Sequence, residues 1–195
     1  MAVNLKKGQK VDLTKGNPGL SKIMVGLGWD AVEQKHGFFF SSTPDIDCDA
    51  SAFVCINDKL SSKDDVVYFH NLKHKSGAVR HMGDNLTGEG DGDDETINVD
   101  LQCLPASILH LVFTVNSFRG QKFDQVENAY CRIVNNSKNQ ELARFNLAEK
   151  GQHTGVVMAS LSRKGNDWSF KAIGQATNGR TADDLVALAI QAIRT

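Results

Sequence analysis

Short segments of alternating apolar and polar residues recur along most of the chain, and turn-forming residues separate them. A period of two is typical of β-strands, whose successive side chains point to opposite faces of a sheet. The clearest case is the alternation of Ile23, Val25, Leu27 and Trp29 with Met24, Gly26, Gly28 and Asp30. Trp29 is therefore expected to face a core, and Asp30 is expected to point the other way.

The run 47–56 shows the same period and carries acids on one face. Asp47, Asp49 and Ser51 share that face, and Cys48, Ala50 and Ala52 take the other. Further strands are predicted at 65–70, 97–101, 108–116, 129–135, 141–147, 156–161 and 168–175, with a hairpin turn at 135–139. Nine or ten short strands in 195 residues predict an all-β fold of two packed sheets, as a single domain over residues 1–195.

Two places depart from β character. Residues 121–128 are compatible with a short helix before a strand. The segment 181–194 is a stronger helix, because Thr181 and Asp184 have the spacing of a capping box. An apolar stripe follows at Leu185, Leu188, Ala189, Ala192 and Ile193. The expected fold is therefore a β-sandwich with a C-terminal amphipathic helix.

Composition excludes some classes of protein. The chain has 22 Lys and Arg against 23 Asp and Glu, a net charge of −1, so no basic excess favours nucleic acid as a partner. No stretch approaches the ~18 apolar residues of a transmembrane helix, and no signal peptide is recognised. Cys48, Cys55, Cys103 and Cys131 form no metal-binding pattern and are expected to be reduced, buried thiols. These features predict a cytoplasmic protein.

The stretch 84–95 gathers six of the 23 acids within twelve positions, without a Lys or Arg among them. Such a cluster repels itself at pH 7, and a bound divalent cation removes that penalty. Ca²⁺ takes six to eight oxygen ligands in flexible geometry, and the interleaved glycines let backbone carbonyls approach an ion. The absence of sulfur and imidazole favours calcium or magnesium over zinc or copper. The competing interpretation is a solvated acidic surface loop.

The stretch is not an EF-hand loop, because its third position is Leu86 and its sixth is Glu89 instead of glycine. A calcium β-roll is excluded too, because its repeat occurs once. Asp30, Asp47 and Asp49 form a second set of strand carboxylates. If these strand ends lie beside the acidic stretch, they can complete a site for one or two calcium ions.

The same residues carry a family resemblance over nearly the whole length. The chain resembles the TerD-domain proteins of bacterial tellurite-resistance and general stress-response systems. The matching motifs are Leu5-x-Lys7-Gly8, Val11-x-Leu13-Thr14, Pro18-Gly19-Leu20, Val25-Gly26-Leu27-Gly28-Trp29-Asp30, Asp47-x-Asp49-Ala50-Ser51-Ala52-Phe53, the acidic stretch from Gly83 to Glu95, and Asn128-Ala129-Tyr130 with Arg132-x-Val134-Asn135.

The resemblance implies a β-sandwich that binds calcium. The primary hypothesis is a module that acts as a binding or scaffold protein rather than as an enzyme, a choice that family membership does not decide. The metal ligands it implies are Asp30, Asp47, Asp49, Asp84, Asn85, Glu89, Asp91, Asp93 and Asp94. It also implies other Ter-type stress proteins as partners, in cytoplasmic complexes or at the inner face of the membrane. Two alternatives stay open: a metal-dependent enzyme acting on a phosphoester or tellurium oxyanion, and a purely structural assembly protein.

Three further signals complete the sequence-based expectations. Gly26, Gly28 and Ala31 imitate a dinucleotide-binding fingerprint, but no helix is expected after them, so a strand that packs closely on its neighbours is favoured. His70 and His74 are interpreted as loop or strand-end residues. The segment 36–45 is longer than the family pattern, which predicts an influence on access to the ion site or on partner choice.

Overall fold

The structure is a computed structural model that describes residues 2–32, 34–36, 40–42, 47–83, 92–148 and 150–194. Within these ranges the strands form two six-stranded sheets and one two-stranded hairpin. The first, called here the β3 sheet, has the order β1 (Val3–Leu5), β12 (Gln140–Asn146), β11 (Val126–Asn135), β3 (Lys22–Ala31), β9 (Glu95–Asp100) and β8 (Val79–His81). The second, the β6 sheet, has the order β2 (Lys10–Asp12), β14 (Asp167–Thr177), β13 (Gly155–Lys164), β10 (Ile108–Ser117), β6 (Cys48–Ile56) and β7 (Val66–Val67).

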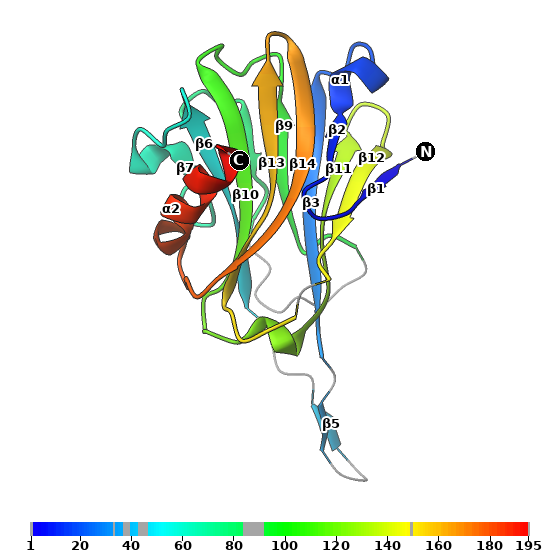
Figure 1. Ribbon diagram of the computed structural model, residues 1–195, viewed down its shortest axis with the longest axis vertical. Helices are drawn as coiled ribbons and strands as arrows, with labels where there is room; N and C mark the ends of the chain where they lie inside the picture. Colours follow the sequence, from blue (N-terminus) through cyan, green and yellow to red (C-terminus); the bar gives the residue numbers. More distant parts are fainter. Residues whose placement is uncertain are drawn as a thin grey trace.

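The two sheets pack face to face as a β-sandwich, as the sequence predicts (Figure 1). The predicted inward residues of β3, including Leu27 and Trp29, are buried in the main core, and Asp30 is exposed. Cys48, Ala50 and Ala52 of β6 join the same core from the opposite sheet. The period of two therefore assigned both faces of these strands correctly.

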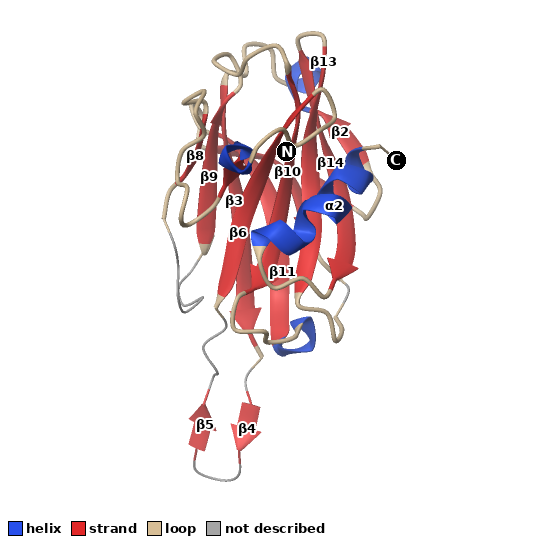
Figure 2. Ribbon diagram, turned by 90° about the vertical axis from the view of Figure 1, so that its left-hand side faces the viewer, coloured by secondary structure: helices blue, strands red, loops and turns tan. Residues whose placement is uncertain are grey.

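The helix α2 (Ala182–Ile193) crosses the outer face of the β6 sheet (Figure 2). Its start is the predicted capping box: Thr181 Oγ1 accepts from the Asp184 N–H, and the Asp184 carboxylate accepts from the Thr181 N–H. Its buried residues are Leu185, Ala189 and Ala192, and they pack with Phe53 and Val112 in a second apolar cluster. The helix lies mainly against β10 and β13 and also reaches β6, where Phe53 and Cys55 belong to the same cluster.

Several local predictions need correction. Only Val66–Val67 of the expected strand 65–70 pairs as a strand, because Tyr68 and Asn71 exchange backbone hydrogen bonds that close a turn. The expected helix at 121–128 shrinks to a 3₁₀ turn at Phe123–Gln125, because the following residues pair with β3 as the start of β11. Three cysteines are buried as expected, but Cys103 is exposed.

Some short elements have too few residues for a periodicity to show. They are β1, β2, β8, the single turn α1 (Leu13–Gly16) and the 3₁₀ turn Lys63–Asp65. Within the long segment 36–45, part of the chain pairs as the hairpin of β4 (Gln34–His36) and β5 (Phe40–Ser42), which extends from the lower end of the sandwich in Figures 1 and 2. Residues 37–39 and 43–46 lie outside the described ranges, and the influence of this segment on access or partners stays a prediction.

Candidate functional site

Five of the nine predicted metal ligands lie in described segments, and all five come from the same end of the sandwich. Asp30 is near the end of β3, Asp47 and Asp49 stand at the start of β6, and Asp93 and Asp94 directly precede β9. β3 runs antiparallel to β9, with Leu27 opposite Glu95, so the end of one strand meets the start of the other. Asp84, Asn85, Glu89 and Asp91 lie outside the described residues.

Asp94 is fixed to the backbone of β3. Its N–H donates to the Leu27 carbonyl at 2.9 Å, and its Oδ2 accepts from the Trp29 N–H at 2.7 Å. Burial raises the pKa of this carboxyl to about 6, and the negative charges of Asp30, Glu95 and Asp93 act in the same direction against the Trp29 hydrogen bond. The charged form of Asp94 is therefore disfavoured first by burial and further by the neighbouring acids.

Asp93 is held by cations instead. Arg132 donates from Nε to Oδ1 at 2.7 Å and from Nη2 to Oδ2 at 2.9 Å, and the Tyr130 hydroxyl donates to Oδ1 at 2.9 Å. These three bonds occupy three of the roughly four lone-pair directions of a carboxylate. The hydrogen bonds that Arg132 donates to Asp93 are the main reason that the pKa of the Arg132 guanidinium is raised.

The two strand glycines explain how Asp93 reaches Arg132. A Cβ built at Gly26 would lie 2.3 Å from the Asp93 carboxyl, and one built at Gly28 would lie 2.4 Å from the Tyr130 ring. Both glycines leave space on the outer face of β3 for side chains from the neighbouring segments. The fingerprint-like spacing is therefore a packing feature within a strand, in agreement with the sequence-based interpretation.

Asp47 and Asp49 lie on the outer face of the β6 sheet, on the other side of the sandwich from Asp93. Asp47 Oδ2 accepts from Arg119 Nε at 3.0 Å, and Asp49 Oδ2 is 3.4 Å from Asn116 Nδ2. Cys48, between them, points inward. Burial raises the pKa of its thiol, with further contributions from the charges of Asp49, Asp47, Glu95 and Asp94. Acids from both sheets therefore act on this one buried thiol.

Glu95 connects the two sheets at the same end, a role the sequence did not reveal. Its carboxylate is buried, and Oε2 accepts from the Ala50 N–H at 2.6 Å and lies 3.1 Å from His81 Nε2. The Gly83 N–H donates to His81 Nδ1, which places the imidazole proton on Nε2, facing Glu95. The inward register of Glu95 with Ile97 and Val99 is the sequence signal for this placement.

The described acids do not by themselves complete a metal centre. In the part of the chain that the structure describes, no group of three or more His, Cys, Asp or Glu side chains is placed to hold one ion. The described segments contain no helix long and apolar enough to cross a membrane. His74 lies in a loop, as expected, with Nε2 3.1 Å from Asp65 and Nδ1 2.7 Å from Ser76.

A two-sheet sandwich with acidic side chains at one end defines the protein as an all-β sandwich domain. The family model described as TerD domain matches residues 1–189, and the chain belongs to this family. The tellurium resistance protein TerZ of Serratia marcescens is 48% identical over 193 residues, covering 98% of each chain. Stress response protein SCP2 of Bacillus subtilis (strain 168) is 44% identical, covering 96% of this chain and 98% of its own.

Solved structures support the fold. A homologue of the telluride resistance protein TerD from Streptomyces coelicolor A3(2) superposes with a TM-score of 0.68 at 20% identity. The match covers 88% of this chain and 98% of the solved chain. The family is thus one of tellurium resistance and general stress response, and the resemblance inferred from the motifs is confirmed.

Proposed function

We propose that this protein is a calcium-binding stress-response module associated with tellurite resistance, which acts by binding partners rather than by catalysis. The observation that carries the proposal is Asp94, whose pKa is raised to about 6 by burial and by three neighbouring acids. A carboxylate held in such surroundings gains most from a cation. The acid-rich stretch 84–91 precedes this position in the chain, with Gly92 and Asp93 between them.

The available donors fit calcium. Asp30, Asp47, Asp49 and Asp94 supply hard carboxylate oxygens at one end of the sandwich, and Asp84, Asn85, Glu89 and Asp91 add oxygen donors in sequence. One or two Ca²⁺ ions, when bound, supply the positive charge that this set of carboxylates requires. The donors that complete a site are assigned to residues 84–91, because the described acids alone form no such group.

Asp93 has a separate place in this proposal. Its carboxylate is largely occupied by Arg132 and Tyr130, and one lone-pair direction on Oδ2 remains for a further ligand. We assign Asp93 the task of anchoring the end of the acidic stretch to the outer face of the β3 sheet.

The proposed consequence is a surface that exists only in the ion-bound state. With their repulsion removed, the carboxylates can hold residues 84–91 against the strand ends and present them to a partner. We place these partners among other Ter-type stress proteins, in the cytoplasm or at the inner face of the membrane. The names of the relatives in Serratia marcescens and Bacillus subtilis support the stress-response context.

The test is calorimetric titration of chelator-stripped protein with Ca²⁺ and, separately, with Mg²⁺. Saturable binding of Ca²⁺ that is tighter than binding of Mg²⁺ is expected. A folded protein that binds neither ion would make the acidic stretch a solvated surface loop and would overturn the proposal. Metal-dependent turnover of a phosphoester or tellurium oxyanion would favour an enzyme instead.

A further inference from the structure

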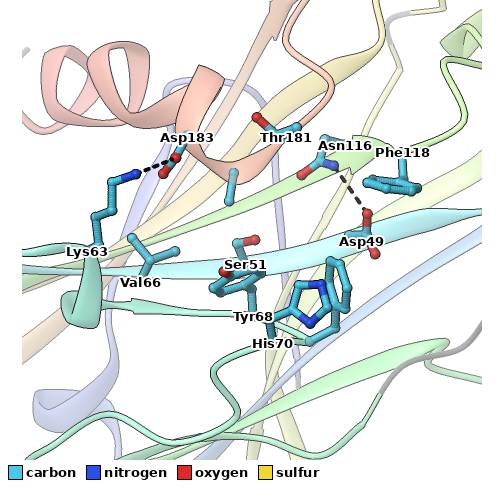
Figure 3. Close-up of a pocket in the computed structure, with 12 residues that line it drawn as sticks. Asp49, Ser51, Lys63, Val66, Tyr68, His70, Asn116, Phe118, Thr181 and Asp183 are labelled. Atoms are coloured by element: carbon cyan, nitrogen blue, oxygen red, sulfur yellow. Dashed lines mark hydrogen bonds and ion pairs between the residues drawn. The ribbon is translucent and has the colours of Figure 1, made fainter.

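A cavity of about 260 Å³ lies on the outer face of the β6 sheet, between β6, the turn after β7 and the start of α2 (Figure 3). Its floor is formed by Asp49 and Ser51 of β6 and by Asn116 of β10. Asp49 and Asn116 are directly opposed in the strand register, and Ser51 follows on the same face, opposite Thr114. Cross-strand neighbours of this kind lie within about 5–8 Å, so the three polar groups are concentrated in one place.

Two side chains of the floor each carry a buried polar atom without a hydrogen-bond partner in the described part of the chain. Ser51 is 1% exposed and Asn116 is 2% exposed, yet Ser51 Oγ and Asn116 Oδ1 have no hydrogen-bond partner among the described residues. The amide nitrogen of Asn116 donates to the Arg180 carbonyl at 2.8 Å, which orients Oδ1 away from that bond. A buried acceptor without a donor is costly, so a ligand that brings donors to this floor is favoured.

One side of the cavity is aromatic. Tyr68 and Phe69 pack edge to face with ring centroids 5.4 Å apart, and Phe69 meets Phe118 at 6.3 Å. Phe118 is 51% exposed, an unusual position for a large apolar side chain. Such rings provide contact area for an apolar ligand body and attract a cation placed over their faces.

The charges around the cavity also favour a cation. Asp49 contributes a carboxylate to the floor, and at the rim Lys63 is paired with Asp183 at 3.2 Å. At the N-terminus of α2, the capping box engages the N–H groups of Thr181 and Asp184. Among the Asp, Glu, Lys and Arg side chains that line the cavity, Asp49 and Asp183 are acidic and Lys63 is basic, so their formal charge is −1.

We propose that this cavity binds a small organic cation: a primary ammonium group attached to a short apolar or aromatic body. A primary ammonium has three N–H donors, which match the three acceptors offered by Asp49, Ser51 and Asn116. The apolar body of the ligand lies against Tyr68, Phe69 and Phe118. The site uses Asp49 but otherwise depends on residues outside the proposed calcium ligands.

The test is titration of the full chain with phenethylamine, followed by calorimetry and by amide chemical shifts, in the presence of chelator. Chelator keeps the result independent of calcium, so the two proposals fail or succeed separately. Saturable binding is expected, with shifts concentrated at Ser51, Asn116 and Phe118. Phenethyl alcohol, phenylpropionate and the trimethylammonium analogue are expected to bind at least about tenfold more weakly, because each lacks the charge or the N–H donors.

Two variants test the site itself. Ser51→Ala removes one acceptor and Phe118→Ala removes part of the aromatic wall, and each is expected to weaken phenethylamine binding by about tenfold. Ser160→Ala, a buried serine elsewhere in the same sheet, and Leu72→Ala, another exposed apolar residue, are the matched controls and are expected to bind as the parent does. Amide spectra establish that each variant is folded.

Three outcomes would overturn the proposal. They are the absence of saturable binding up to about 10 mM amine, equal affinity for the neutral or anionic analogue, and unchanged affinity in both folded site variants.

Discussion

Arg132 reaches Asp93 across a whole strand. Arg132 belongs to β11 and Asp93 directly precedes β9, and β3 lies between those two strands in the sheet. Gly26 is the residue of β3 that pairs with Arg132, and the Asp93 carboxyl occupies the space in which a Gly26 side chain would lie. The ion pair therefore passes over β3 at its glycine and anchors the end of the acidic stretch.

Arg132→Gln is expected to lower the free energy of unfolding by about 2 kcal/mol, because Asp93 would remain 5% exposed without its cation. Urea unfolding at pH 7 measures the change. Lys63→Gln is the control, since its pair with Asp183 is exposed and contributes no more than about 0.5 kcal/mol. Equal losses in the two variants would contradict the anchoring role of Arg132.

Gly26→Ala is expected to destabilise the protein by about 2 kcal/mol or more, because the new methyl group must displace the Asp93 carboxyl. Gly16→Ala is the matched control, because a Cβ there meets nothing within 4 Å and its backbone angles suit alanine. The double variant Gly26→Ala with Asp93→Ala should lose less stability than the sum of the two single changes. Thermal and urea unfolding of all four variants provide the comparison, and strict additivity would argue against the contact.

The raised pKa of Asp94 predicts how the stability of the metal-free protein depends on pH. Its pKa is raised to about 6 in the folded state, against about 3.9 for an unperturbed Asp. The folded protein therefore binds more protons than the unfolded chain between these values, and the contribution of Asp94 is full below about pH 4 and lost as pH rises through 6.

Asp94→Asn should remove this contribution. Between about pH 5 and pH 7 the parent loses the contribution of Asp94, and the variant has none to lose. The stability of the variant relative to the parent is therefore expected to rise, as measured by urea unfolding in chelator at about these two pH values. Asp64 is an exposed acid in another part of the chain. The stability difference between Asp64→Asn and the parent should therefore be the same at both pH values. A parent and Asp94→Asn that differ equally at both pH values would refute the shifted pKa.

Removal of calcium is expected to lower the melting temperature. If one ion binds only the folded state, ligand at about a hundred times Kd adds about 2.7 kcal/mol to the free energy of unfolding. Asp47→Asn combined with Asp94→Asn should weaken calcium binding by at least about tenfold, because two carboxylates leave the donor set. Calorimetry checks this, with Asp64→Asn as control, and an unchanged affinity would exclude both residues as ligands.

The strand pattern was predictable because burial on one face leaves a period of two in the sequence. Trp29 and Asp30 lie on the faces that this period assigns to them, and the helix α2 begins at its capping box. Short elements such as β2 and β8 were missed, because three residues carry too little pattern. The helix expected at 121–128 gave way to strand pairing with β3, a non-local contact that local propensity does not contain.

The candidate site was predictable in composition but not in arrangement. The sequence identified Asp30, Asp47, Asp49, Asp93 and Asp94 as acids of interest, and the fold places all five at one end of the sandwich. It did not show that Arg132 would occupy Asp93, and the register that turns Glu95 inward did not identify Ala50 and His81 as its partners. These contacts join residues separated by 14 to 45 positions, so their pairing depends on strand order and register.

The sequence by itself therefore determined the β-sandwich, the C-terminal helix, the family and the acid-rich composition of the site, because each is written in local periodicity or in a contiguous motif. Only the tertiary structure decided which acids are neutralised by a cation of the protein and which remain in excess negative charge. It also decided that Ser51, Asn116 and the ring of Phe118 meet in one cavity. The physical reason is that electrostatic and hydrogen-bond energies depend on distances across the sheets, which the packing of the two layers fixes.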